Sequence, residues 1–150
     1  MEDKKIININ RNAKHDYFLE EFFEAGLVLT GTEIKSIRGG HVQFKEAYVD
    51  FINNEAFIID MNINAYDHGN IFNHQEDRNR KLLLHKSQIR YLRKQVQQQG
   101  YTVVPVRLYL LNGYAKLEIA LAKGKHLYDK RQDLKERDVK REIEKAMKLR

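Results

Sequence analysis

The amino-acid sequence predicts a mainly β fold: a small OB-like antiparallel β-barrel with short flanking helices and a basic C-terminal tail that is disordered when free. Three observations lead to this prediction, namely a hairpin pattern over residues 104–121, a second β-rich stretch over residues 47–63, and a surplus of positive charge after residue 122. With 42% hydrophobic residues, the chain can build one small core. We therefore expect a single OB-like domain over residues 1–122 and a tail over residues 123–150.

The hairpin pattern centres on Asn112-Gly113, a pair that favours a two-residue turn because both residues tolerate a positive φ. With this turn, one register produces both an apolar face and a charged face. Pro105 lies near the start of the first strand and indicates an edge or a bulge there. The expected partners are Val104 with Leu121, Val106 with Ile119, Leu108 with Leu117, Leu110 with Ala115, Arg107 with Glu118, and Tyr109 with Lys116.

Shorter patterns predict the remaining elements. The stretch over residues 47–63 is broken around Asn53-Asn54, which indicates a second hairpin, whereas residues 17–29 fit either a strand or a helix. A capping box from Thr30 to Glu33 opens a short helix that Gly39-Gly40 ends. Residues 87–99 have apolar side chains at helical spacing and predict a helix packed on the sheet, while residues 67–79 form a polar loop. Closure of these elements into a barrel is inferred from size and class alone.

The tail holds most of the net charge of +6. Residues 123–150 contain eleven Lys or Arg against six Asp or Glu, whereas residues 1–122 contain sixteen against fifteen. A basic tail on a nearly neutral domain usually indicates a polyanionic partner, the alternative being a solvated segment that only aids solubility. Residues 132–150 lack Gly and Pro but have only a thin apolar stripe, so we expect them to become helical on docking. The stripe consists of Val139, Ile143, Ala146 and Met147.

The composition argues against several other classes of protein. Cysteine is absent, which excludes disulfides, thiol catalysis and cysteine-built zinc sites. No apolar run of about 18 residues and no signal-type segment is visible, so we expect a cytoplasmic protein with no membrane partner. The six histidines lack zinc-ligand spacing, and no phosphate-binding glycine motif or catalytic triad is present, so we expect no metal, cofactor or enzyme activity. A hydrolase with paired carboxylates stays open because of Glu20, Glu21, Glu24 and Glu33.

Two basic segments favour RNA binding instead. Residues 10–17 (Asn-Arg-Asn-Ala-Lys-His-Asp-Tyr) and residues 78–81 (Arg-Asn-Arg-Lys) combine positive charge with hydrogen-bonding groups. Tyr17, Tyr48 and Tyr101 offer faces on which bases can stack, although each of them can equally serve in the core or at its rim. Together with the basic tail, these segments predict a protein that binds RNA.

From about residue 7 onward, the chain carries an ordered set of short motifs. They are Asn10-Arg11, Ala13, His15, Tyr17, Glu20-Glu21, Glu24-Ala25-Gly26, Gly31-x-Glu33-Ile34-Lys35-Ser36-Ile37-Arg38, Arg78-x-Arg80-Lys81-Leu82-Leu83-Leu84, Gly100-Tyr101-Thr102-Val103-Val104-Pro105, Ala122-Lys123-Gly124-Lys125 and Tyr128-Asp129-Lys130-Arg131. In order and spacing this set resembles the SsrA-binding proteins (small protein B), the partners of transfer-messenger RNA in bacterial ribosome rescue. Asn12 and His126 depart from the Lys or Arg expected at their positions.

The resemblance implies a six-stranded OB-like barrel that binds the elbow of the tRNA-like domain of transfer-messenger RNA. It further implies delivery of this RNA to stalled ribosomes for trans-translation, with elongation factor Tu as an indirect partner through the charged RNA. The tail would enter the empty mRNA channel beside the decoding centre of the small subunit (16S rRNA) and fold there as a helix. The alternative is a generic OB-type RNA chaperone or ribosome-associated protein without specificity for transfer-messenger RNA.

The resemblance and the basic segments together nominate the site residues. Glu24 would contact RNA by accepting hydrogen bonds from base N–H or ribose 2′-OH groups, the alternative being a pairing with a nearby Lys or Arg that itself meets the RNA. Candidates for the ribosome are Tyr128, Asp129, Lys130 and Arg131 at the decoding centre, and Val139, Ile143 and Met147 along the mRNA channel. Candidates for RNA binding are Asn10, Arg11, Lys14, His15, Tyr17, Glu24, Tyr48, Arg80, Lys81, Leu83, Lys116, Lys123, Lys125 and His126.

Overall fold

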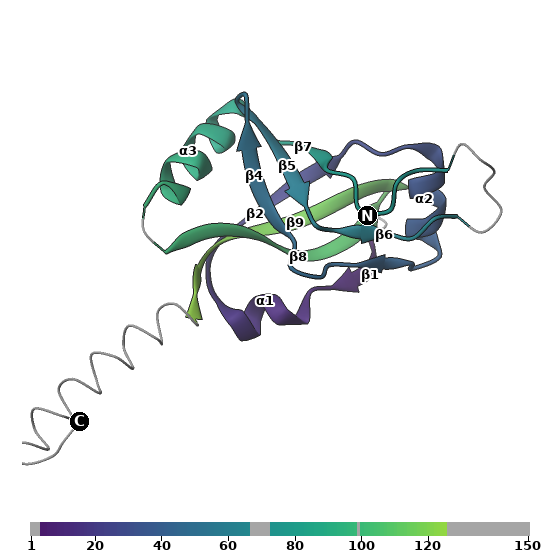
Figure 1. Ribbon diagram of the computed structural model, residues 1–150, viewed down its shortest axis with the longest axis horizontal. Coiled ribbons are helices and arrows are strands. Elements are labelled where there is room, and N and C mark those ends of the chain that lie inside the picture. Colours follow the sequence, from purple (N-terminus) through teal and green to yellow (C-terminus); the bar gives the residue numbers. More distant parts are fainter. Residues whose placement is uncertain (1–3, 67–72, 99, 126–150) are drawn as a thin grey trace, which may run out of the picture.

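The computed structural model of the chain describes residues 4–66, 73–98 and 100–125, and it confirms a mainly β, antiparallel fold (Figure 1). The strands are β1 (Lys4–Ile9), β2 (Tyr17–Leu27), β3 (Val42–Gln43), β4 (Tyr48–Ile52), β5 (Glu55–Ile59), β6 (Asn62–Ile63), β7 (Arg80–Leu83), β8 (Tyr101–Leu111) and β9 (Tyr114–Gly124). The helices are α1 (Arg11–Asp16), α2 (Gly31–Arg38) and α3 (Lys86–Val96).

Seven strands form one curled sheet in the order β1-β8-β9-β2-β7-β5-β4, and β3 pairs with β6 in a separate two-stranded sheet. The prediction of a closed barrel is therefore wrong for the described residues, as is the expected number of six strands. β1 and β4 are the edges of the main sheet, and no ladder joins them. Register shifts in β1, β2 and β8 increase the coiling of the sheet, and β4 comes to lie against β8 without pairing to it.

The β8–β9 hairpin confirms the predicted turn, with φ of 51° at Asn112 and 85° at Gly113. The predicted partners are also found from Leu110 with Ala115 to Arg107 with Glu118. Beyond this point the register prediction is wrong, because a shift between Pro105 and Arg107 places Val104 opposite Ala120. The shift lies at the proline that indicated an edge or a bulge. The bulge is real, but β8 is an interior strand between β1 and β9.

The remaining local predictions are confirmed where a turn or a cap specifies them. Asn53 and Asn54 both have a positive φ and connect β4 to β5. Thr30 caps α2 in a complete capping box with Glu33, and the helix ends before Gly40, whose φ is 79°. The segment that fitted either a strand or a helix forms the long strand β2, and the helix predicted over residues 87–99 is α3. Helix α1 was not expected from the sequence.

Two apolar clusters stabilise the fold. The larger one fills the curl of the sheet and includes Ile89 and Leu92 of α3. The smaller one lies on the outer face of the sheet, where Ala13 of α1 packs on Val104 and Ala122. Each buried Val, Leu or Ile side chain contributes about 1.5–3 kcal/mol, and these contacts hold α3 and α1 in place at different parts of the sheet (Figure 1).

Candidate nucleic-acid interface

Strand pairing brings three of the predicted site residues together on the outer face of the sheet. Gly26 of β2 lies opposite Leu83 of β7 on one side and Lys116 of β9 on the other. Glu24 lies two residues from Gly26 and therefore on the same face of β2. Leu83 is 54% exposed, although it is a large apolar residue. Glu24, Leu83 and Lys116 form what we call the Glu24 surface.

The Glu24 surface continues onto β8 at Tyr109, a residue that the sequence did not nominate. The Tyr109 hydroxyl donates a hydrogen bond to the Glu24 carboxylate, and burial together with this bond raises the pKa of Tyr109. Arg107 Nε lies 2.9 Å from Glu118 Oε1, as an ion pair without the alignment of a hydrogen bond. The alternative pairing of Glu24 with Lys or Arg is thus replaced by one with a tyrosine. The hairpin register already placed Tyr109 beside Lys116, which could have revealed it.

Gly26 lets Leu83 lie across β2. A Cβ atom built on Gly26 would come within 3.3 Å of Leu83 Cβ and 3.4 Å of Leu83 Cδ1. The first distance is slightly shorter than ordinary van der Waals contact, so a larger residue at position 26 requires Leu83 to move by a few tenths of an ångström. The glycine therefore shapes the apolar part of the Glu24 surface.

A pocket of about 590 Å³ opens at the seam where β4 lies against β8 without pairing. Its lining includes Asn10, Tyr17 and Tyr48, three residues that the sequence nominated and that lie far apart along the chain. Burial raises the pKa of Tyr17, and the neighbouring Asp16 and Glu46 raise it further. The pocket thus combines aromatic faces with hydrogen-bond acceptors. It is lined by Asn10, Asn12, Ala13, Asp16, Tyr17, Lys45, Glu46, Ala47, Tyr48, Asp60, Thr102 and Val104.

Asn10 also has a structural role beside this pocket. Its side-chain nitrogen donates a 2.8 Å hydrogen bond to the Pro105 carbonyl, and its backbone N–H donates a 2.8 Å bond to the Val106 carbonyl. These two bonds satisfy the carbonyls at the β8 bulge and hold the start of α1 against the sheet. On α1, His15 Nδ1 lies 2.8 Å from the Asp16 carboxylate, and Arg11 and Lys14 are exposed.

The last described lysines lie over aromatic rings beside α1. Lys123 Nζ is 4.8 Å from the ring centroid of Tyr101, and Lys125 Nζ is 5.1 Å from that of Phe18. Lys125 Nζ also donates a 2.9 Å hydrogen bond to the Lys14 carbonyl. Cation–π contacts of this kind contribute about 0.5–1 kcal/mol at exposed sites. The end of β9 is thereby attached to β2, β8 and α1.

The prediction that Arg80 contacts RNA is wrong for this structure, because the side chain is fully buried. Arg80 Nε donates a 2.6 Å hydrogen bond to the buried Glu33, and Arg78 donates two further bonds to the same carboxylate. Burial by itself would raise the pKa of Glu33, but the bonds from Arg78, Thr30 and Arg80 outweigh it and lower the pKa. The sequence segment that suggested a basic patch, residues 78–81, instead contributes Arg78 and Arg80 to an ion cluster with Glu33 that joins β7 to α2. Lys81 pairs with Glu55 at 2.9 Å and stays at the surface.

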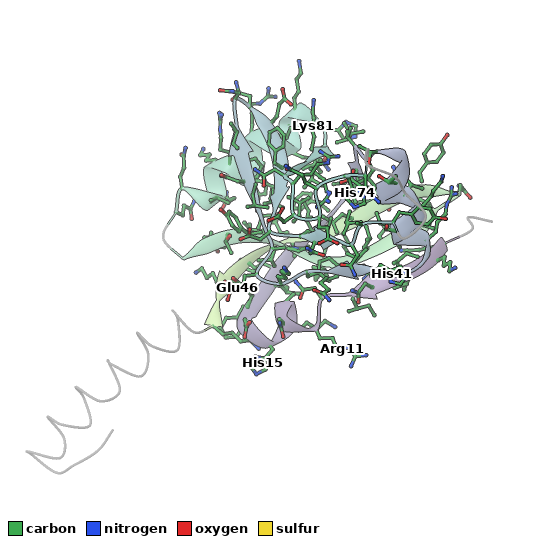
Figure 2. The ribbon with its side chains drawn as sticks, turned by 45° about the vertical axis from the view of Figure 1, so that its right-hand side comes forward. Arg11, His15, His41, Glu46, His74 and Lys81 are labelled. Carbon is green, nitrogen blue, oxygen red and sulfur yellow. The ribbon has the colours of Figure 1, made fainter. Side chains whose placement is uncertain are left out.

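Figure 2 shows Arg11 and His15 around α1 on one side of the molecule and Lys81 on the opposite side. The nominated residues thus divide between the seam with α1 and the Glu24 surface, and Lys81 lies beside the latter because it is two residues from Leu83 on the same face of β7. Within residues 4–66, 73–98 and 100–125, no group of three His, Cys, Asp or Glu side chains could hold a metal ion.

Comparison with known proteins identifies the family. The family model described as "SmpB protein" matches residues 7–149, nearly the whole chain. The chain belongs to the SmpB family.

Relatives in this family carry the name SsrA-binding protein. The SmpB relative from Shouchella clausii is 53% identical over 97% of this chain and 94% of its own length, and that from Bacillus cereus strain B4264 is 55% identical over 95% and 92%. A solved structure described as "tmRNA-SmpB: a journey to the center of the bacterial ribosome" matches with a TM-score of 0.68 and 43% identity. The match covers 79% of this chain and 83% of the other.

The remaining SmpB site predictions lie outside the described residues. These are His126, the decoding-centre candidates Tyr128, Asp129, Lys130 and Arg131, and the channel candidates Val139, Ile143 and Met147. The tail predicted to be disordered spans residues 123–150; its first two residues, Lys123 and Gly124, belong to β9 instead, and residues 126–150 lie outside the described ones. In the part that the structure describes, no helix has the length and apolar character to cross a membrane.

Proposed function

We propose that this chain binds the tRNA-like domain of transfer-messenger RNA and delivers that RNA to stalled ribosomes for trans-translation. The observation that carries the proposal is the convergence of Glu24, Leu83 and Lys116 on one face of the sheet. Family membership and the SmpB structure described with tmRNA and the bacterial ribosome support it. In this proposal the protein acts in the cytoplasm by recognition, and the chemistry of peptide transfer belongs to the ribosome.

The Glu24 surface would read the RNA through a mixture of contacts. The exposed Leu83 would pack against an unstacked base or ribose, and Lys116 would neutralise phosphate. Glu24 would accept hydrogen bonds from base or 2′-OH groups, because a carboxylate beside phosphate stabilises a complex only in that way. The curled sheet would serve as an OB-like platform for this contact.

The seam would supply a second part of the same interface. Tyr17 and Tyr48 at the pocket would stack with RNA, with Asn10 as a hydrogen-bonding neighbour. Arg11, Lys14, His15, Lys123 and Lys125 would approach phosphates around α1, with His126 beyond them, and Lys81 would contribute from the other side. We do not carry Arg80 into this set.

We further propose that the RNA-binding domain extends through the end of β9, because Lys123 and Gly124 pair with β2, and that the chain after residue 125 is a separate tail. The tail would be unfolded when free and would fold as a helix in the empty mRNA channel. Tyr128, Asp129, Lys130 and Arg131 would lie at the decoding centre of 16S rRNA, and Val139, Ile143 and Met147 along the channel. Elongation factor Tu would join this complex through the charged RNA.

A titration of the full chain against transfer-messenger RNA and an unstructured RNA of the same length tests the proposal. Specific recognition predicts much tighter binding of transfer-messenger RNA. Each phosphate contact should lower log affinity by about 0.7–0.9 per log unit of salt. Equal affinity for both RNAs would overturn specific recognition and favour a generic RNA chaperone.

A further inference from the structure

The charge of the folded domain is strongly divided along the chain. Residues 78–117 contain nine Lys or Arg and no Asp or Glu, whereas residues 1–77 contain seven Lys or Arg and fourteen Asp or Glu. The near-zero net charge of residues 1–122 is therefore the sum of an acidic first part and a basic segment that runs from β7 through α3 to β9. Such a segment either pairs with carboxylates elsewhere in the fold or leaves positive charge at the surface.

Four of these nine cations are paired. Arg78 and Arg80 share Glu33, Lys81 pairs with Glu55, and Arg107 pairs with Glu118. Arg93 donates to the Asn54 side chain. The remaining cations are Lys116 on the Glu24 surface and three residues of α3. Carboxylates of Glu33, Glu55 and Glu118 thus neutralise the flanks of the basic segment, whereas no carboxylate pairs with the described cations of α3.

The three cations of α3 lie on one exposed line. Lys86, Arg90 and Lys94 are all exposed, and among the described residues none of them forms an ion pair or a hydrogen bond. They are four residues apart, so they share one face of the helix at intervals of about 6 Å. Ile89 and Leu92 are buried in the main core and fix the orientation of the helix. We call Lys86, Arg90 and Lys94 the α3 ridge.

The α3 ridge and the Glu24 surface lie on different sides of β2. Tyr91 of α3 contacts Phe23, with 6.4 Å between the ring centroids. Phe23 and Glu24 are successive residues of a strand and therefore point to opposite faces of the sheet. In Figure 1, α3 is also well separated from α1, at the end of the sheet formed by β4 and β5. RNA on the Glu24 surface or at α1 would leave the ridge free.

We infer that the α3 ridge is a second RNA-binding surface, which holds the phosphate backbone of a duplex segment. The ridge is convex and lies on a helix, so it suits a row of phosphates rather than a strand threaded through a groove. The exposed aromatic of α3, Tyr91, donates a 2.6 Å hydrogen bond to Glu21 and lies beside Phe23, so its ring is held against β2 and is a poor stacking face for a single strand. Three unpaired cations in a line therefore favour backbone contact without base readout.

This inference goes beyond the proposed function and rests on it only in that the partner is RNA. The test uses the full chain with the double substitution Arg90→Gln and Lys94→Gln. The matched control, Lys5→Gln with Arg38→Gln, also removes two exposed positive charges but leaves α3 intact. The probes are a blunt 20-base-pair RNA duplex without loops and the isolated tRNA-like domain, each titrated by fluorescence anisotropy over a range of salt concentrations.

The α3 variant should bind the duplex about tenfold more weakly at about 0.1 M salt, and its log–log salt slope should fall by about two. The control variant should keep duplex affinity within about twofold. Equal weakening by the α3 and control variants would overturn the inference, because net charge alone would then explain binding. Unchanged duplex binding by the α3 variant would also overturn it. Either result would leave the proposed function standing if Glu24→Gln still weakens binding of the tRNA-like domain.

Discussion

At the scale of single residues, Glu24 shows how a carboxylate can serve in an RNA interface. The Tyr109 hydroxyl already donates to it, so the carboxylate is oriented before any RNA arrives. A carboxylate has more acceptor sites than one donor uses, and the remaining ones stay available to base or ribose groups. Pre-orientation of this kind lowers the entropy lost on binding.

Glu24→Gln should therefore weaken transfer-messenger RNA binding by about 1–3 kcal/mol, the usual cost of an unmet polar partner. The free energy of unfolding should change by less than about 0.5 kcal/mol, because the glutamine carbonyl can still accept the Tyr109 hydroxyl. Anisotropy titrations and thermal melts measure the two effects. Glu21→Gln, the same charge change on the same strand, is the control. A large loss of stability with unchanged affinity of the folded fraction would make Glu24 a structural residue.

Glu33 should make stability depend on pH in the acid range. Its folded-state pKa lies below the ordinary value of 4.5, so its contribution is complete above about that pH and is lost as pH falls through the lower folded-state value. Glu33→Gln leaves Arg78 and Arg80 without a carboxylate and should cost about 3–5 kcal/mol near neutral pH. Urea unfolding of the unsubstituted chain and of Glu33→Gln, from about pH 7 to pH 3, measures how their difference in stability changes with pH. The inference fails if the difference in stability stays constant on acidification.

At the scale of elements, local sequence patterns predicted the structure correctly wherever residues close together in the chain determine its geometry. Asn112-Gly113, the Thr30 capping box and the helical spacing in α3 act within a few residues, and all three are found. The bulge near Pro105 was indicated but its effect on register was not, because the shift also depends on bonds from Asn10, ninety-five residues away. For the same reason the closure of the sheet was predicted wrongly.

The candidate site was predictable to a similar extent. The motifs nominated Glu24, Leu83 and Lys116, which the sheet does bring together. The sequence did not distinguish Lys81 at the surface from the buried Arg80, because burial depends on Glu33, which lies 47 residues away in the chain. Charge in a short segment says nothing of the distant carboxylate that neutralises it. Tyr109 was missed because its contact with Glu24 follows from the pairing of β8, β9 and β2 and not from its own neighbours in the chain, although the hairpin register placed it beside Lys116.

The anchoring of α1 to β8 can be tested at Asn10. Asn10→Ala removes the bond to the Pro105 carbonyl and leaves that half-buried acceptor unpaired, which should cost about 1–3 kcal/mol. For a chain of this size each kcal/mol lowers Tm by about 2–4 °C. Asn12→Ala, on the exposed side of α1, should leave Tm within about 1 °C. Equal Tm values for both variants would show that Asn10 does not hold the helix in place.

At the scale of the whole molecule, RNA capture and ribosome action should be separable. Deleting Asp129 to Arg150 leaves every described strand and helix intact, so transfer-messenger RNA binding should persist. Accommodation on stalled ribosomes should be lost, because nothing then occupies the vacant mRNA channel. Alanine transfer to the nascent chain in a reconstituted stalled complex measures this beside an RNA titration.

Ile143→Pro refines the same prediction, because proline in a helix interior costs about 3 kcal/mol. It should impair tagging while leaving the circular dichroism of the free protein nearly unchanged. Val139→Ala is a milder change on the same stripe and should retain most of the tagging. Normal tagging by the truncated protein would mean that the tail only aids solubility.

The unpaired seam between β4 and β8 also gives the sheet a compliant side. β8 has ladders on both sides, whereas β4 has one, so the width of the 590 Å³ pocket depends on side chains and not on a fixed hydrogen-bond spacing. In deuterium exchange, amides of β4 should therefore exchange faster than those of β8, and RNA that spans Tyr17 and Tyr48 should slow them. Equal protection of both strands without RNA would mean that the seam is as rigid as a closed ladder. A compliant seam would let one pocket follow small differences in the shape of the RNA without unfolding the sheet.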